Sequence, residues 1–145
     1  MEQRQITHLS VPVVGMGTSG TLDLPDKDQP LANLVIEAAL DAGSTLIDSS
    51  PMYGRAEAVS GRALAKRRDE SLIATKVWTE DDDEAQRQID ASLSYFGGHV
   101  ELFQVHNLLA WRTRLDQLQA RRDAGQLTLI VPRTGSRRHS RNSRK

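Results

Sequence analysis

The sequence has no cysteine and no long apolar run, and both absences narrow what it can be. Without cysteine, this 145-residue chain has no disulfide, no thiolate metal site and no cysteine nucleophile. No apolar run approaches the roughly 20 residues that a membrane-spanning helix needs. The first five residues are polar and lack a signal-peptide core, and the four histidines show no spacing typical of a metal site. We therefore expect a cytoplasmic protein with no membrane contact and no metal.

The charge is balanced overall but unevenly distributed. Residues 131–145 carry only basic charges, so residues 1–130 are net acidic. The segment after Val131 has no apolar pattern, which predicts a folded body over residues 1–130 and a basic, disordered tail over 131–145. A basic arm can bind nucleic acid through its phosphates, but we favour a solvated tail without that role. The abrupt change in composition indicates a chain that is truncated or frameshifted after about residue 130.

Short apolar runs alternate with helical patterns along the body. The runs bounded by turn residues predict buried parallel strands at 13–16, 45–47, 71–74, 100–103 and, as a fifth, 127–131. Apolar residues at helical spacing predict helices between them, over about 30–42, 56–66, 81–96 and 111–124. A unit of about thirty residues suits an eight-unit α/β barrel of ~250 residues, but also a doubly wound open sheet. Residues 6–12 predict a small hairpin that closes the bottom of a barrel.

Three ionisable residues stand at the ends of successive predicted strands. Asp48, Lys76 and His106 each follow an apolar run directly. In (β/α)₈ enzymes the carboxyl ends of the strands form the active-site face. One such residue alone is more often an ion pair or a loop cap, but three at equivalent positions predict a site.

Tyr53 lies in the loop that follows the second predicted strand. It could be an aromatic lid packed on the next helix. Alternatively, its phenol could protonate a developing alkoxide, provided that a nearby ammonium such as Lys76 makes the phenol more acidic. Asp48 would then fix the position of Lys76, and His106 could orient a carbonyl oxygen or share the proton relay, as in general acid catalysis.

These residues lie within motifs that together resemble the aldo-keto reductase family. The motifs are Gly15–Thr18, Asp48–Gly54, Glu57 with Gly61 and Leu64, Ala74–Val77, and Gln104–Asn107. The resemblance runs from about residue 6 to residue 126 and implies the N-terminal half of a (β/α)₈ TIM barrel, with about four βα units and open or paired edges. It further implies an oxidoreductase that reduces aldehydes or ketones, small-molecule carbonyl substrates, with NADPH.

The same resemblance implies roles for particular positions. The proton-transfer tetrad would be Asp48, Tyr53, Lys76 and His106, with Tyr53 as the acid. Gly17, Thr18 and Asp48 would lie near the nicotinamide half of NADP, and Trp78 and Asn107 would line the substrate pocket. Asn107 stands where many members have tryptophan.

A family member would continue through further strands that carry the remaining cofactor contacts. We therefore expect this truncated chain to be weakly active or inactive alone. The alternative is a non-catalytic half-barrel interaction protein, such as a homodimer that pairs its open sheet edges, because exposed parallel strands aggregate unless they are covered. A third hypothesis, a basic-tailed binding module, rests on the tail alone.

Overall fold

The computed structural model describes residues 1–133, so the expected tail lies outside the described residues from position 134 onward. The strands are β1 (Gln3–Ile6), β2 (Leu9–Pro12), β3 (Met16–Gly17), β4 (Leu46–Asp48), β5 (Leu72–Val77), β6 (Val100–His106) and β7 (Leu127–Arg133). The helices are α1 (Gln29–Asp41), α2 (Ala56–Leu64), α3 (Asp82–Tyr95) and α4 (Trp111–Asp123), with short 3₁₀ turns at Asp26–Asp28 and Arg68–Glu70.

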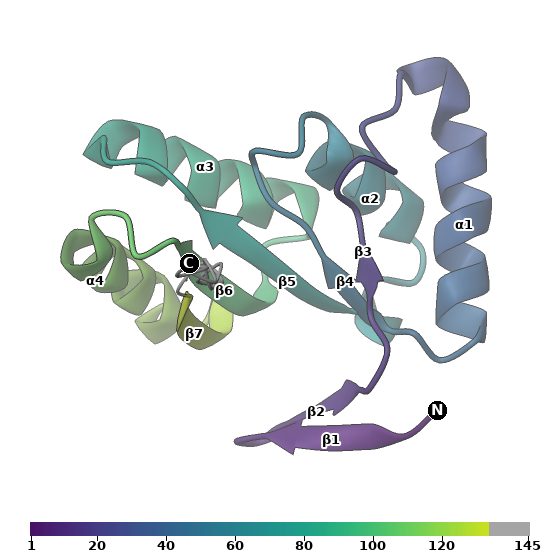
Figure 1. The fold of residues 1–145 in the computed structure, drawn as a ribbon, viewed down its shortest axis with the longest axis horizontal. Helices are drawn as coiled ribbons and strands as arrows, with labels where there is room; N and C mark the ends of the chain where they lie inside the picture. The colour runs from purple at the N-terminus through teal and green to yellow at the C-terminus, as the bar shows by residue number, and fades with distance from the viewer. Residues whose placement is uncertain (134–145) are drawn as a thin grey trace, which may run out of the picture.

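Five parallel strands form the main sheet in the order β3-β4-β5-β6-β7 (Figure 1). A doubly wound sheet reverses its strand order at a switch point, and no reversal occurs within residues 1–133. Each strand instead pairs with the next one in the chain, as in a barrel. The helices lie around the outside of this curved sheet, so the expected partial barrel is confirmed, with β3 and β7 as its two edges.

The predicted hairpin is present, whereas the first predicted strand is largely wrong. β1 pairs antiparallel with β2, from Gln3 opposite Pro12 to Ile6 opposite Leu9, and the hairpin lies beyond the start of β3 (Figure 1). Val13 and Val14 are 44% and 56% exposed and belong to no strand. They connect the hairpin to the sheet, so their apolar side chains have no layer to pack against.

The core lies between the helices and the outer face of the sheet. Ile47, Ile73 and Phe103 project outward from β4, β5 and β6 and are fully buried. They pack in one cluster with residues from every helix, among them Ile36, Val59, Ile89 and Leu118. The helices predicted over 56–66 and 81–96 bury apolar residues in this core. Their packing holds in place the strands whose ends carry the candidate site.

Helix α1 forms where the sequence predicts it, but the stripe that located it is not the buried one. Its buried residues are Ala32, Ile36 and Leu40. Leu31 and Leu34, whose helical spacing is part of the pattern that predicts a helix over 30–42, are 56% and 64% exposed. The helix therefore has two apolar faces, of which residues 1–133 cover only one.

Helices α2 and α3 approach each other closely at Gly61. A methyl group there would overlap the carbonyl oxygen of Tyr95 and lie 3.2 Å from the Tyr95 Cβ. Glycine is therefore required by close packing, although alanine has the better helix propensity by about 1 kcal/mol.

We expect Gly61→Ala to lower the free energy of unfolding by about 1–3 kcal/mol, because the added methyl overpacks the interface. Urea unfolding followed by circular dichroism measures the change. Ala58→Gly in the same helix is the matched control for helix propensity alone. If Gly61→Ala were as stable as the unaltered chain or more so, propensity would outweigh the contact and the packing argument would be wrong.

Candidate active site

The inner face of the sheet carries polar side chains at the carboxyl ends of its strands. Asp48 pairs in register with Ala74, and Lys76 with Gln104. Residues two apart on a strand share a face, as do partners in parallel register. Asp48, Lys76, Gln104 and His106 therefore lie on one face of three neighbouring strands.

Lys76 and Asp48 form the central ion pair of this face. The Lys76 Nζ donates to Asp48 Oδ1 at 2.9 Å, to Asp48 Oδ2 at 3.0 Å and to the Ser49 carbonyl oxygen at 2.6 Å. The Lys76 side chain is 0% exposed, whereas that of Asp48 is 38% exposed. A buried ammonium is tolerated when it is paired and hydrogen-bonded. The carboxylate therefore holds the charge of Lys76 in place and also presents an accessible edge.

Tyr53 lies against this ion pair. The Lys76 Nζ is 5.3 Å from the centroid of the Tyr53 ring, within the range of a cation–π contact. A tight turn places the ring, because the Tyr53 N–H donates to the Ser50 carbonyl at 3.0 Å and the Ala56 N–H donates to the Tyr53 carbonyl at 3.2 Å. Helix α2 begins directly after this turn. Tyr53 also packs against the hydrophobic core.

Gln104 also lies on this inner face, but it is not among the residues predicted from the sequence. Its Nε2 donates to Asp48 Oδ1 at 3.3 Å, and its side chain is buried. It precedes His106 by two positions on β6, so strand alternation from His106 could have identified it. His106 is half-buried at the end of the same strand. Gln104 thus connects the strand of His106 to the Lys76–Asp48 pair.

Thr18 and Gly17, both predicted to lie near the cofactor, have different surroundings: Thr18 is buried, whereas Gly17 borders open space. The Thr18 side chain is fully buried, and its hydroxyl oxygen lies within hydrogen-bond distance of the Asp48 carbonyl oxygen, at 3.2 Å, and of Ser49 Oγ, at 2.9 Å. Its direct effect is therefore to hold the end of β4. Gly17 pairs in register with Asp48, and a methyl group on it would meet nothing within 4 Å. Gly17 thus borders open space beside the accessible carboxylate.

The two predicted substrate-pocket residues follow directly after β5 and β6 at the same sheet edge. Trp78 is 41% exposed, and its backbone N–H donates to Gln88 Oε1 at 3.0 Å. Asn107 is exposed and has a φ of 56°. Leu108 and Ala110 also have positive φ, at 54° and 45°, a region that leucine and alanine rarely occupy. The β6–α4 loop is therefore held in an uncommon conformation next to His106.

Glu57 is a buried carboxyl on the other side of β5 from Lys76. It accepts hydrogen bonds from Thr75 Oγ1 at 2.6 Å and from Ser92 Oγ at 2.8 Å, and so ties α2 to β5 and α3. Burial raises the pKa of Glu57 above its ordinary value of 4.5, while the two hydrogen bonds and the charge of Lys76 oppose this increase. Strand β5 is thus held on its outer face by Glu57 and on its inner face by the Lys76–Asp48 pair.

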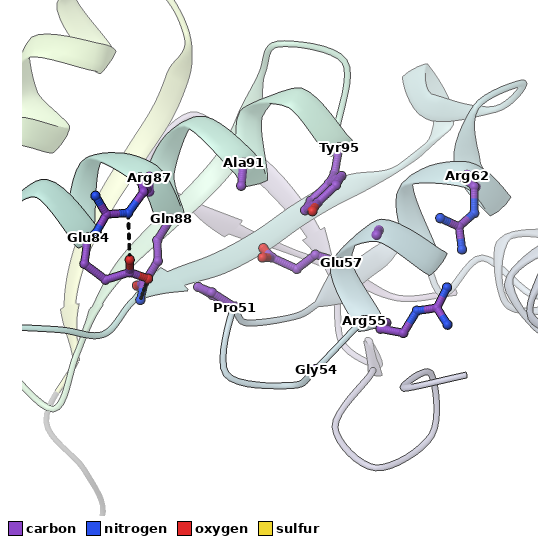
Figure 2. A pocket seen from close by; sticks show the side chains of 11 residues that line it. Pro51, Gly54, Arg55, Glu57, Arg62, Glu84, Arg87, Gln88, Ala91 and Tyr95 are labelled. Atoms are coloured by element: carbon purple, nitrogen blue, oxygen red, sulfur yellow. Dashed lines mark hydrogen bonds and ion pairs between the residues drawn. The ribbon is translucent and has the colours of Figure 1, made fainter. Parts of the chain in front are cut away.

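A surface pocket of about 480 Å³ lies between α2 and α3 on the outside of the sheet (Figure 2). Glu57, Gln88 and Tyr95 are among its lining residues, whereas the predicted tetrad is not. Asp48, Lys76 and His106 of the predicted tetrad lie on the opposite, inner face of the sheet. Within residues 1–133, no group of three or more His, Cys, Asp or Glu side chains could hold a metal ion. No helix in that part of the chain is long and apolar enough to cross a membrane.

Sequential parallel strands with a Lys–Asp–Tyr group at their carboxyl ends define a barrel-type α/β protein with a polar inner site. The model of the Aldo/keto reductase family matches residues 13–126. The chain belongs to this family.

Known relatives support the same assignment. The chain is 38% identical over 103 residues to an aldo-keto reductase of Mycolicibacterium smegmatis, an alignment that covers 67% of this chain and 34% of the relative. It is 35% identical over 77 residues to the methylglyoxal reductase DkgA of Yersinia pestis, covering 50% of this chain and 27% of that protein. The chain therefore spans about a third of the length of the curated relatives it matches.

Solved structures share the fold. The holo form of an aldo-keto reductase from Bacillus halodurans has a TM-score of 0.78 at 20% identity, covering 92% of this chain and 50% of that one. A mutant of the Gox0644 protein, solved in complex with NADPH, has a TM-score of 0.71 at 19% identity, covering 91% of this chain and 49% of that one.

We expect substitutions of Glu57 to separate its charge from its hydrogen bonds. Because the pKa of Glu57 is raised on folding, the folded state retains the proton at pH values where the unfolded state has lost it. The unaltered chain should therefore lose stability relative to Glu57→Gln as the pH rises above about 4.5. Urea unfolding of both proteins from pH 4.5 to 8 measures this difference.

Glu57→Ala is the contrasting variant. It leaves the Thr75 and Ser92 hydroxyls buried without their acceptor, and we expect it to cost about 2–4 kcal/mol. A pH-independent difference between Glu57→Gln and the unaltered chain would show that the carboxyl does not titrate abnormally.

Proposed function

We propose that residues 1–133 carry the proton-transfer half of a reductase site for aldehydes or ketones. The observation that carries this proposal is the buried Lys76 ammonium, which is hydrogen-bonded to Asp48 and 5.3 Å from the Tyr53 ring centroid. A phenol becomes an effective acid at neutral pH when a neighbouring cation stabilises its anion. Family membership supports the same chemistry.

In the proposed mechanism each residue has one role. The Tyr53 hydroxyl donates its proton to the oxygen of the carbonyl group as that oxygen becomes an alkoxide. Lys76 stabilises the resulting phenolate, and Asp48 holds the ammonium in position. His106, which ends β6 on the same face, orients the carbonyl oxygen. NADPH, when bound, supplies the hydride.

The chain's residues fit the nicotinamide end of such a cofactor. Gly17 leaves open space beside the accessible Asp48 carboxylate, and Thr18 fixes the backbone that carries Asp48. A side chain at position 17 would narrow this space. We propose NADP because the structural neighbour solved with NADPH shares the fold. Trp78 and Asn107, at the same edge, are the proposed substrate-side residues.

A chimera tests the catalytic proposal. Residues 13–126 would replace the matching segment of the Mycolicibacterium smegmatis aldo-keto reductase, so that the rest of the barrel comes from the relative. We expect this chimera to oxidise NADPH with 4-nitrobenzaldehyde, and Tyr53→Phe to lower its kcat by about 10²–10⁴-fold. Tyr95→Phe, at the only other tyrosine, is the matched control and should leave kcat unchanged.

The 145-residue chain alone is a second arm of this experiment. Within residues 1–133 no further strand pairs with β3 or β7, so we expect the chain alone to show neither measurable NADPH affinity nor turnover. Turnover by the chain alone that Tyr53→Phe abolishes would show that the half-barrel is a working enzyme, against this expectation. A folded, active chimera whose kcat is the same with tyrosine or phenylalanine at position 53 would overturn the catalytic proposal itself.

A second candidate function is a non-catalytic homodimer. The specific observations are that α1 exposes Leu31, Leu34 and Val35 and that β3 is an edge strand of the sheet in residues 1–133. A second copy is the proposed partner because this chain covers about half of a complete structural neighbour, so two copies contain about as many residues as one barrel. Pairing would remove apolar surface and strand edges from water.

Sedimentation velocity at increasing concentration tests this candidate. We expect the unaltered chain to dimerise and Leu34→Glu to shift it to monomer by placing a charge in the apolar face. Glu37→Gln, an exposed change on the same helix, is the control and should leave the dimer intact. A monomer at all concentrations would exclude the homodimer.

A further inference from the structure

The loop between β3 and α1 crosses the loop that carries Tyr53 and is bonded to it. Asp23 Oδ1 accepts a hydrogen bond from the backbone N–H of Arg55 at 2.9 Å. Arg55 is two residues past Tyr53, at the N-terminal end of α2, where Figure 2 labels it beside Gly54. The contact joins segments that are 32 residues apart in the sequence.

Gly54 makes this crossing possible. Its φ is 61°, and a methyl group on it would overlap the Asp23 carboxylate. The carboxylate therefore lies directly against the backbone of the residue that follows Tyr53. A glycine is needed here both for the left-handed conformation and for the close approach.

Asp23 is itself held in position from both sides. Leu22 is 2% exposed and lies in the core, and Leu24 packs against that core. Further along, Asp26 pairs with the side chains of Arg55 and Arg62, the latter at 3.3 Å. Asp23 therefore projects from an anchored segment.

From this geometry we infer that Asp23 is a positioning residue for Tyr53. Its carboxylate fixes the backbone at residues 54–55, and this keeps the Tyr53 ring over the Lys76 ammonium. The inference rests on the proposed function, since it concerns how the acid of that site is held. It assigns a role to the β3–α1 loop, in which the predicted tetrad has no member.

The experiment measures the geometry of the ring without requiring turnover. In the isotopically labelled 145-residue chain, the nuclear Overhauser effect between the Tyr53 ring protons and the Lys76 Hε protons reports their proximity. Tyr95→Phe assigns the two tyrosine signals. We expect Asp23→Ala to weaken this effect at least twofold, whereas Asp23→Asn, whose side-chain oxygen can accept the same hydrogen bond, retains it.

Asp28→Ala is the matched control, because it removes a carboxylate of the same loop whose side chain makes no cap hydrogen bond at the start of α1. It should leave the effect unchanged, and an equal loss in Asp28→Ala and Asp23→Ala would overturn the specific role of Asp23. An undiminished effect in Asp23→Ala would overturn it as well. An absent effect in the unaltered chain would contradict the site geometry and hence the proposed function, which is a distinguishable failure.

Amide exchange of Arg55 decides the question if Asp23→Ala does not fold. In the unaltered chain, the hydrogen bond to Asp23 predicts that the Arg55 amide exchanges at least tenfold more slowly than an unprotected amide in the same sequence. Asp23→Asn should keep most of this protection. An unprotected Arg55 amide in the unaltered chain would refute the inference.

Discussion

The buried Lys76 ammonium is the constraint on which the inner face of this half-barrel depends. A charge with no solvent exposure requires full compensation, and Asp48 and the Ser49 carbonyl provide it from the neighbouring strand. This requirement ties the ends of β4 and β5 together. Tyr53 and Gln104 contact the same ion pair. The Tyr53 ring faces the Lys76 ammonium, and the Gln104 amide donates a hydrogen bond to the Asp48 carboxylate. A stability requirement and the proposed catalytic arrangement therefore coincide at Lys76.

Strand β5 is stabilised from both sides by polar groups. On its outer face Thr75 bonds to Glu57, which also accepts from Ser92 on α3. On its inner face the next residue, Lys76, is held by Asp48. Because successive side chains of a strand point to opposite faces, the adjacent residues Thr75 and Lys76 hold β5 from its two sides. The strand that supplies the ammonium is thereby held by side-chain contacts on both faces, which suits the proposed role of Lys76 in proton transfer.

The sequence predicted the alternating elements, the ends of most helices and the strand-end position of Asp48, Lys76 and His106. These are local signals, set by apolar spacing and turn residues. Val13 and Val14 were wrongly assigned to a buried strand, because an apolar run does not reveal whether a layer exists to cover it. For α1, two apolar faces were present and periodicity alone did not decide which of them the sheet would bury. Gln104 and Asp23 were not singled out, since their partners lie 56 and 32 residues away.

The amino-acid sequence by itself determined the class of the chain. Thirty-residue βα units, strand-end ionisable residues and a set of motifs in family order sufficed for a partial aldo-keto reductase barrel. Only the tertiary structure decided the strand order, the pairing of Lys76 with Asp48, the burial of Glu57 and the crossing of Asp23 over Gly54. Local periodicity reports which face of an element is apolar, whereas these contacts arise where distant segments pack together and compete for space and for hydrogen-bond partners.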